Sequence, residues 1–230
     1  ARDALAAGAG ISGELLRIRA SCLIEEKKFA EAAAVLEKIS EGKPEDAEAA
    51  LQFAGALERS GERREAAAAY ARFLGKFPNH SAGPGAALRL GFLEAGEGNR
   101  EAALAAYRLA VRSPDLGVAE PARYQLALDL EDRAKLSEAL KAYELLAVRN
   151  LAASKWRRAA AWRAAAMLER GGEWKRALAY YLRIERTGKA GVAEEKEARQ
   201  AAARARRLEA YLQSVKRREE KMESREPLFR

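Results

Sequence analysis

The sequence ALRLGFLEAGEGNREAALAAYRLAVRSPD, residues 87–115, decides the fold because it contains two helical stretches joined by a short polar turn. The first stretch holds a Leu-Gly pair at Gly91, and the turn GEGNR supplies the glycine that is expected just past a helix end. In the second stretch Ala103 is followed four residues later by Tyr107, and Pro114 closes the pattern. This order predicts two antiparallel helices.

The pattern of the second stretch recurs, so that the chain holds five copies in all. The intervals between successive small residues are 34, 37, 36 and 38 residues. Small side chains let two helices approach to about 8 Å, and a large side chain then fills the gap beside the next pair. A period in the mid-thirties with two helices per unit is typical of a helical repeat array. The pairs are Ala32 with Leu36, Ala66 with Tyr70, Ala103 with Tyr107, Ala139 with Tyr143, and Ala177 with Tyr181.

These residues resemble the tetratricopeptide repeat family over roughly residues 14–186. The resemblance implies an all-α fold, a right-handed α-solenoid of about five helix-turn-helix repeats. Most repeats lack the aromatic residue of the family's first helix, and the connections are longer than usual. Such connections are similar to those of bacterial cell-envelope members, including outer-membrane assembly lipoproteins and the periplasmic protein associated with the Tol-Pal system. The resemblance therefore favours a periplasmic or cell-envelope location over a cytoplasmic one.

Three segments follow from this interpretation. Residues 1–13 are either a tail or the remnant of a preceding helix, and residues 14–190 form the array. Residues 191–230 form a long charged helix and tail, which we expect to cover the last repeat because exposed ends of such arrays need a cap. One narrow stripe of small and apolar residues is suited to this contact: Ala198, Ala201, Ala205, Leu208, Leu212 and Val215.

Residues suited to chemistry are scarce, so we expect no enzyme activity, no cofactor, no metal site and no small-molecule substrate. His80 is the only histidine, and the sequence favours an exposed loop position for it. Cys22 is the only cysteine, and its place in the first helix favours core packing over a reactive thiol. The sequence also lacks a glycine-rich phosphate loop and zinc-ligand spacing.

Binding of a protein or peptide partner is the function that the resemblance implies, because the first helices of such repeats line a concave groove. Three rings, Phe92, Tyr124 and Trp162, fall on successive repeats, and each is either exposed in the groove or part of the core. Exposed rings beside arginines suit an extended segment or amphipathic helix of a partner. The predicted groove residues are Leu88, Arg89, Phe92, Tyr124, Gln125, Leu128, Trp162 and Arg163.

Charge is unevenly distributed. Residues 1–148 carry 20 basic and 23 acidic side chains, whereas residues 149–230 carry 22 and 11. The basic C-terminal third is either a solvated face or a surface that recruits an acidic protein, an anionic membrane or nucleic acid. Nucleic acid is the least favoured, since acidic blocks on the same helix repel phosphates. The candidate basic surface comprises Arg204, Arg206, Arg207, Lys216, Arg217 and Arg218.

Overall fold

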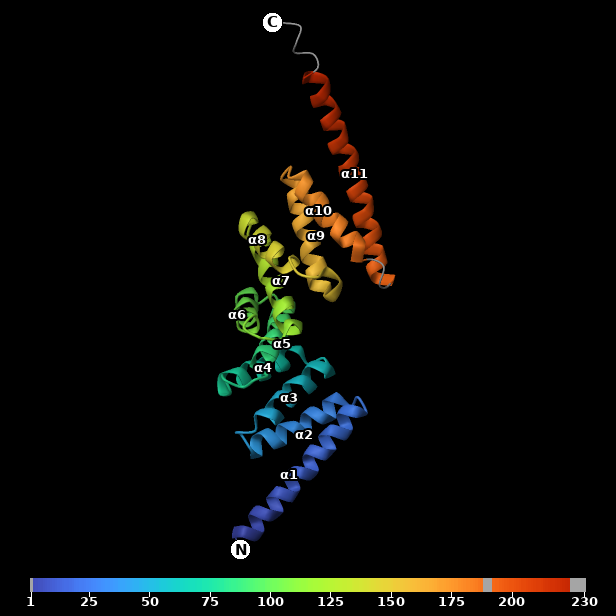
Figure 1. Ribbon diagram of the computed structural model, residues 1–230. Coiled ribbons are helices and arrows are strands. Elements are labelled where there is room, and N and C mark those ends of the chain that lie inside the picture. Colours follow the sequence, from blue (N-terminus) through green and yellow to red (C-terminus); the bar gives the residue numbers. More distant parts are fainter. Residues whose placement is uncertain (1, 188–191, 224–230) are drawn as a thin grey trace. The chain divides into compact units, whose positions relative to one another are not determined.

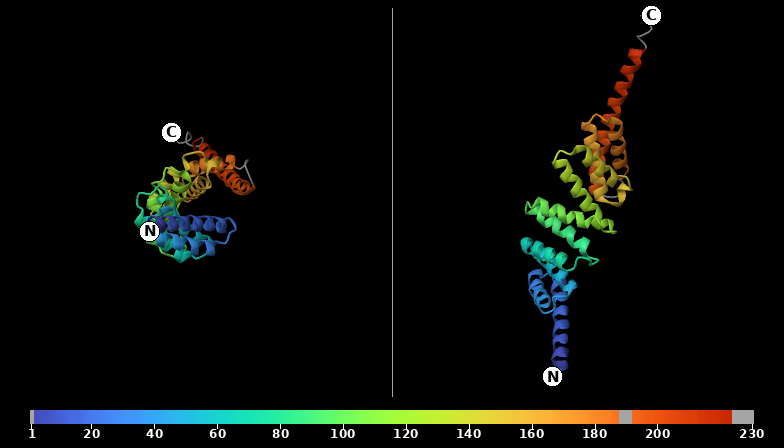
Figure 2. Two further views of the ribbon diagram at one scale, coloured as in Figure 1. Left: turned by 90° about the horizontal axis from the view of Figure 1, so that it is seen from below. Right: turned by 90° about the vertical axis from the view of Figure 1, so that its left-hand side faces the viewer.

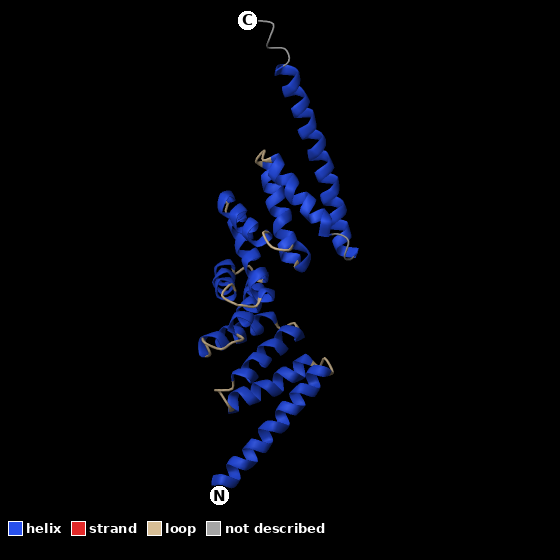
Figure 3. Cartoon of the chain, in the orientation of Figure 1, coloured by secondary structure: helices blue, strands red, loops and turns tan. Residues whose placement is uncertain are grey.

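The computed structural model describes residues 2–187 and 192–223 of the chain (Figure 1). Every regular element in these ranges is helical, and none is a strand (Figure 3). The all-α prediction is therefore confirmed for the described residues. The helices are α1 (Arg2–Glu25), α2 (Phe29–Gly42), α3 (Ala47–Ser60), α4 (Arg63–Lys76), α5 (Gly83–Gly96), α6 (Arg100–Ala110), α7 (Leu116–Asp132), α8 (Leu136–Ala147), the 3₁₀ helix η1 (Leu151–Ala153), α9 (Lys155–Arg170), α10 (Trp174–Thr187) and α11 (Val192–Glu223).

The helices form two compact units, residues 1–122 (unit 1) and residues 123–230 (unit 2), with the boundary inside α7. In unit 1 each helix from α1 to α6 packs against the next one along the chain. In unit 2 the same holds from α8 to α11 (Figure 2). Neighbours in sequence are thus neighbours in space, as expected of a repeat array.

One left-handed residue ends the first helix of every repeat and sets the register. Lys27, Gly61, Gly98, Ala134 and Gly172 all have positive φ angles, between 58° and 94°. Each lies nine residues before the large side chain of its repeat. The residue after each one donates its backbone N–H to a carbonyl oxygen five residues earlier, at 2.8 to 3.0 Å, which satisfies the helix end. The five turns are therefore equivalent.

Ala134 occupies this left-handed position with a side chain that glycine lacks. We expect Ala134→Gly to raise the free energy of unfolding by about 0.5 to 1 kcal/mol, because glycine adopts positive φ without steric cost. Ala179→Gly, at an exposed site inside α10, should lower it by about 1 kcal/mol. Urea unfolding followed by tryptophan fluorescence measures both changes, since all three tryptophans lie in unit 2. If Ala134→Gly lowered the free energy of unfolding as much as Ala179→Gly does, the turn at Ala134 would not be strained.

The predicted pairs of small and large residues form the core. The five small residues are at most 3% exposed, and the five large ones at most 4%. Tyr143 and Tyr181 are among the largest fully buried side chains in the described part of the chain. The sequence pattern therefore identified the helix crossings correctly, and alanine there is a packing requirement.

The stripe on α11 packs as predicted against α10 and the core of unit 2. Its first four residues are buried, and Leu212 and Val215 are half-buried. Beyond them Met222 is 71% exposed, so the end of the described helix carries no buried face. The helix thus covers the last repeat along its first half only.

Two expectations about single residues were wrong. Cys22 is exposed, because it lies on the face of α1 that points away from the core residues Ala20 and Leu23. His80 is half-buried: its ring meets Phe73 edge-on at 5.4 Å between centroids, and its Nδ1 accepts the N–H of Ala82. The turn after α4 folds back on its own helix, which the sequence pattern does not reveal.

Candidate functional site

A tyrosine, a glutamate and an arginine from three consecutive helices form a polar set in unit 1. Tyr70 of α4 donates its hydroxyl to Glu58 of α3 at 2.9 Å, and Arg89 of α5 donates to the other carboxylate oxygen at 3.3 Å. Burial, followed by the neighbouring charge of Glu58, raises the pKa of Tyr70 well above its usual range. The tyrosine therefore stays a neutral donor.

The same set occurs twice in unit 2. Tyr143 of α8 donates to Glu131 of α7 at 3.0 Å, and Arg163 of α9 donates to the same oxygen at 3.3 Å. The second set lies one repeat further along. In it, Tyr181 of α10 donates to Glu169 of α9 at 2.8 Å, and Arg204 of α11 donates to that oxygen at 2.8 Å. In the other two sets the arginine comes from the first helix of the next repeat. Here the capping helix α11 supplies it instead.

Sequence reasoning missed these sets, although a signal exists. The glutamate precedes the tyrosine by twelve residues in all three cases. The arginine follows the glutamate by 31, 32 or 35 residues. The tyrosine spacing is fixed by the shared turn, whereas the arginine spacing varies with the length of the next connection.

Tyr107 departs from this pattern. Ala95 stands twelve residues before it, where the other tyrosines have their glutamate. Its buried hydroxyl has no hydrogen-bond partner among the described residues. Burial alone raises the pKa of Tyr107 to about 12. The α5–α6 repeat therefore lacks the polar contact that the three sets share.

A cavity of about 750 Å³ opens beside the two sets of unit 2. Two indole rings, those of Trp162 and Trp174, supply its apolar walls, and three arginines supply its donors. Trp162 meets Tyr181 edge-on at 5.4 Å between centroids, with the guanidinium of Arg204 5.9 Å from the indole centre. The lining residues are Glu131, Trp162, Arg163, Ala166, Glu169, Arg170, Trp174 and Arg204.

The charges of this cavity are arranged asymmetrically. The side chains of Glu131 and Glu169 are only 13 and 20% exposed, whereas those of the three arginines are 42 to 68% exposed. Arg170 reaches Glu131 at 3.4 Å, so two arginines share that carboxylate. Three cations face two anions, and the cations are the outer layer. The cavity surface is therefore suited to an additional negative group.

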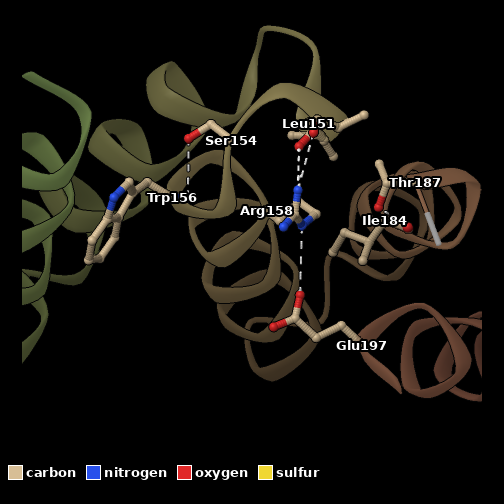
Figure 4. Close-up of polar contacts among 8 residues, drawn as sticks. Leu151, Ser154, Trp156, Arg158, Ile184, Thr187 and Glu197 are labelled. Carbon is tan, nitrogen blue, oxygen red and sulfur yellow. Dashed lines mark hydrogen bonds and ion pairs between the residues drawn. The ribbon is translucent and has the colours of Figure 1, made fainter. Parts of the chain in front are cut away.

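Arg158 fixes the start of α9 relative to η1 and α11 (Figure 4). Its Nη1 donates to the carbonyl oxygens of Leu151 and Ala152 at 3.3 and 3.4 Å, and its Nε lies 3.9 Å from a carboxylate oxygen of Glu197. The side chain is buried, so these partners offset the cost of placing its charge there. The contact helps to hold α11, and with it Arg204, beside α9.

The predicted groove residues divide between the units. In unit 1, Leu88 and Phe92 are half-buried and Arg89 is exposed. Phe92 packs edge-on against Tyr107 at 5.7 Å. Counted from the left-handed turn residue, Leu88 is ten positions upstream and Phe92 only six. Phe92 is thus not equivalent to the other two predicted rings, which occupy the position of Leu88.

In unit 2, Tyr124, Gln125, Leu128, Trp162 and Arg163 are all half-buried. Only Trp162 and Arg163 line the cavity. The ring of Tyr124 instead packs between two others, at 5.8 Å from Tyr143 and 5.3 Å from Trp156. Each of the three rings is half-buried, so each is partly packed and partly accessible.

The candidate basic surface also separates into two parts. Arg204 belongs to the cavity, and its hydrogen bond to Glu169 raises the pKa of its guanidinium. The other five basic residues are exposed on α11, where Lys216 pairs with Glu220 at 3.8 Å. Among the described residues, no group of side chains has the composition of a metal site, and no helix is long and apolar enough to cross a membrane.

Comparison with known proteins agrees with this architecture. Residues 23–89 match a family model described as tetratricopeptide repeat. The comparison with curated proteins found no match. The solved structure of MamA is similar over 83% of this chain and 96% of its own, with a TM-score of 0.63 and 18% identity.

Two further solved structures have the same fold. A tetratricopeptide repeat protein from Parabacteroides merdae gives a TM-score of 0.63 at 15% identity, over 89% of this chain and 78% of its own. PilW, described as a type IV pilus biogenesis factor, gives a TM-score of 0.53 at 18% identity, over 88% of this chain and 93% of its own. These likenesses confirm the predicted fold class, a right-handed α-solenoid of about five repeats with a long C-terminal capping helix.

Proposed function

We propose that this tetratricopeptide repeat protein is a non-enzymatic scaffold that binds a segment of a partner protein in the cavity of unit 2. The observation that carries the proposal is the pairing of two indole walls with three outward arginines over buried carboxylates. Aromatic and arginine side chains are the residues that dominate protein interfaces when they lie together in a pocket. Leu88, Arg89 and Phe92 are the corresponding candidates in unit 1.

The chemistry of the cavity favours a partner segment with an acidic side chain beside a large apolar one. A carboxylate accepts paired N–H groups from a guanidinium, and Arg170 is the most exposed of the three. The neighbouring apolar side chain gains by packing on the indole of Trp162 or Trp174. Charge pairing at this site contributes more to specificity and association rate than to final affinity.

A bacterial cell-envelope assembly is the setting that we propose for this interaction. The connection lengths resemble those of envelope members of the family, and the similar PilW is described as a pilus biogenesis factor. Cell fractionation of a producing bacterium tests the location. Recovery of the protein in the cytoplasmic fraction alone would contradict it.

The exposed basic residues of α11 remain a second candidate surface, for an acidic protein partner. Arg206, Arg207 and the run Lys216, Arg217 and Arg218 are exposed along 13 residues of one helix. Binding there depends on charge alone and should weaken steeply with added salt. Cavity binding, which includes apolar contact, should weaken less, so salt dependence separates the two surfaces.

Two peptides test the cavity, SGEFELGS and its neutral analogue SGQFQLGS, each carrying a fluorescent label. We expect the acidic peptide to bind the wild-type chain, and Trp162→Ala to weaken this binding at least tenfold, about 1.4 kcal/mol. Trp156→Ala is the matched control, because Trp156 packs on Tyr124 and lies outside the cavity lining. Fluorescence anisotropy gives the affinities.

The outcomes separate the parts of the proposal. If Trp162→Ala and Trp156→Ala weakened peptide binding equally, the cavity would not be the binding site. Equal binding of the acidic and neutral peptides would keep the cavity and exclude the arginines as its source of selectivity. Failure of both peptides to bind the wild-type chain at millimolar concentration would contradict the proposed partner chemistry.

A further inference from the structure

Unit 1 contains a second, smaller pocket of about 210 Å³, between α2, α3 and α4. Most of its lining residues belong to α2 and α4, the second helices of their repeats, so it is distinct from the predicted groove of first helices. Its apolar walls include Phe53, Phe73 and Phe77, and the last two rings lie 5.5 Å apart between centroids. Ala50 and Ala69 are small side chains in the same lining. An aromatic side chain is therefore the kind of group that packs well there.

The volume of this pocket matches a benzene ring with two substituents. A cavity of about 150 Å³ accommodates benzene, and a further atom the size of a water molecule takes up about 30 Å³. A pocket of about 210 Å³ therefore holds an aromatic ring with about two more heavy atoms. The side chain of tyrosine has this size, because a methylene group and a hydroxyl stand at opposite ends of its ring.

One polar group of the lining favours a ligand that carries a hydroxyl. Ser40 lines the pocket, and its buried Oγ has no hydrogen-bond partner among the described residues. An unpaired buried hydroxyl costs free energy, and a ligand that supplies a partner recovers it. The serine hydroxyl both donates and accepts, and rotation about one torsion turns it toward the pocket. The phenol of tyrosine can complete this contact, whereas the ring of phenylalanine cannot.

The rim of the pocket carries opposite charges on its two edges. Glu37 and Glu41 lie on the α2 edge, and Arg72 and Lys76 lie on the α4 edge. All four residues are exposed, and the ammonium group of Lys76 lies 5.9 Å from the centre of the Phe77 ring. A segment with a basic residue on one side of its tyrosine and an acidic residue on the other is complementary to these edges.

We propose that the pocket of unit 1 binds a tyrosine of a partner protein, carried by a segment with a basic residue on one side and an acidic residue on the other. The ring packs against the three phenylalanines, and its hydroxyl bonds to Ser40. The buried ring carries most of the binding free energy, and the charged rim selects the segment that presents it. This site uses different residues from the cavity of unit 2 and does not depend on the function proposed for that cavity.

Three fluorescently labelled peptides test the proposal: GSRKYEDSG, its phenylalanine analogue GSRKFEDSG and the uncharged GSQNYQNSG. The charged tyrosine peptide should bind the wild-type chain about fivefold more tightly than the phenylalanine peptide, because only the phenol gives Ser40 a partner. It should bind about threefold more tightly than the uncharged peptide, which leaves the rim charges unpaired. Fluorescence anisotropy measures each affinity.

Variants of the chain locate the site and its hydroxyl contact. Ser40→Ala should weaken binding of the charged tyrosine peptide about fivefold and should not weaken binding of the phenylalanine peptide. Ala50→Leu fills the pocket and should weaken binding of both about tenfold. Two controls should leave binding unchanged: Ala68→Leu, at an exposed α4 position outside the lining, and Trp162→Ala, in the cavity of unit 2. Circular dichroism shows whether each variant is folded, and Ser40→Ala keeps the test valid should Ala50→Leu unfold.

Five results would overturn the proposal. Equal affinities of the tyrosine and phenylalanine peptides, or an equal effect of Ser40→Ala on both, would exclude the hydroxyl contact. Binding that survives Ala50→Leu in a folded chain, or that Trp162→Ala abolishes, would place the site elsewhere. Displacement of the peptide by an equal concentration of free p-cresol, or equal binding of the charged and uncharged peptides, would exclude a charged protein segment as the ligand. Failure of the charged tyrosine peptide to bind at millimolar concentration would contradict the site itself.

Discussion

Replacing Tyr181 with alanine should lower the free energy of unfolding of unit 2 by about 3 to 5 kcal/mol, the range for deleting a large buried aromatic side chain. Tyr181 is fully buried, and its ring packs edge-on against Trp162. Its hydroxyl donates to Glu169 at 2.8 Å, so the change also removes a hydrogen bond to a half-buried carboxylate. Urea unfolding followed by tryptophan fluorescence reports unit 2 selectively.

Two variants separate packing from hydrogen bonding. Tyr181→Phe keeps the ring and should cost about 1 to 2 kcal/mol, since only the hydroxyl's hydrogen bonds are lost, the one that it donates to Glu169 at 2.8 Å and the one that it accepts from Arg204 at 3.4 Å. Tyr180→Ala, at the adjacent half-buried position, should cost about 1 kcal/mol, because its hydroxyl lies 3.3 Å from Glu144 and its ring is partly exposed. A loss for Tyr180→Ala as large as that for Tyr181→Ala would show that the assigned register is wrong.

The architecture could be predicted from the sequence because helix packing is encoded locally. Ala177 and Tyr181 are one helical turn apart, and four other pairs repeat that spacing. The same stripe logic identified α11 as a cap through residues such as Ala201 and Leu208. In each case the deciding residues lie on one helix, where side-chain geometry follows from the 3.6-residue period.

The site could be predicted less well because its contacts join different helices. Of the cavity lining, Trp162 and Arg163 were among the predicted groove residues, and Arg204 was predicted only as part of the basic surface. Arg170 and Trp174 were not predicted at all. Arg204 acts at the cavity because α11 packs where a further first helix would lie, which depends on tertiary packing. Phe92 was aligned with the wrong positions because connections of different length shift the spacing between rings.

Gly91→Ala should destabilise unit 1 by about 1 to 3 kcal/mol through overpacking. A methyl group on Gly91 would lie 2.5 and 2.6 Å from two ring carbons of Tyr107, which is 3% exposed. Gly55→Ala is the matched control: its methyl group would meet only the Tyr70 hydroxyl at 3.7 Å, and it should gain about 0.5 to 1 kcal/mol. Thermal unfolding followed by circular dichroism distinguishes a loss from a gain.

The other repeats suggest how the stability that Gly91→Ala removes can be restored by a second substitution. Of the other four repeats, the three that have a tyrosine carry alanine at the position of Gly91, namely Ala54, Ala127 and Ala165, and each of these tyrosines donates to a glutamate twelve residues upstream. In the α5–α6 repeat the Tyr107 ring lies close to Gly91, and its hydroxyl has no partner among the described residues.

We therefore expect Ala95→Glu to restore about 1 kcal/mol in the Gly91→Ala background, because the displaced Tyr107 hydroxyl gains the acceptor that the other repeats provide. In the wild-type background the same change should have a smaller effect, since the ring then stays against Gly91. A double-mutant cycle measures this coupling. Additive effects of the two changes would show that the close approach at Gly91 and the missing glutamate are unrelated.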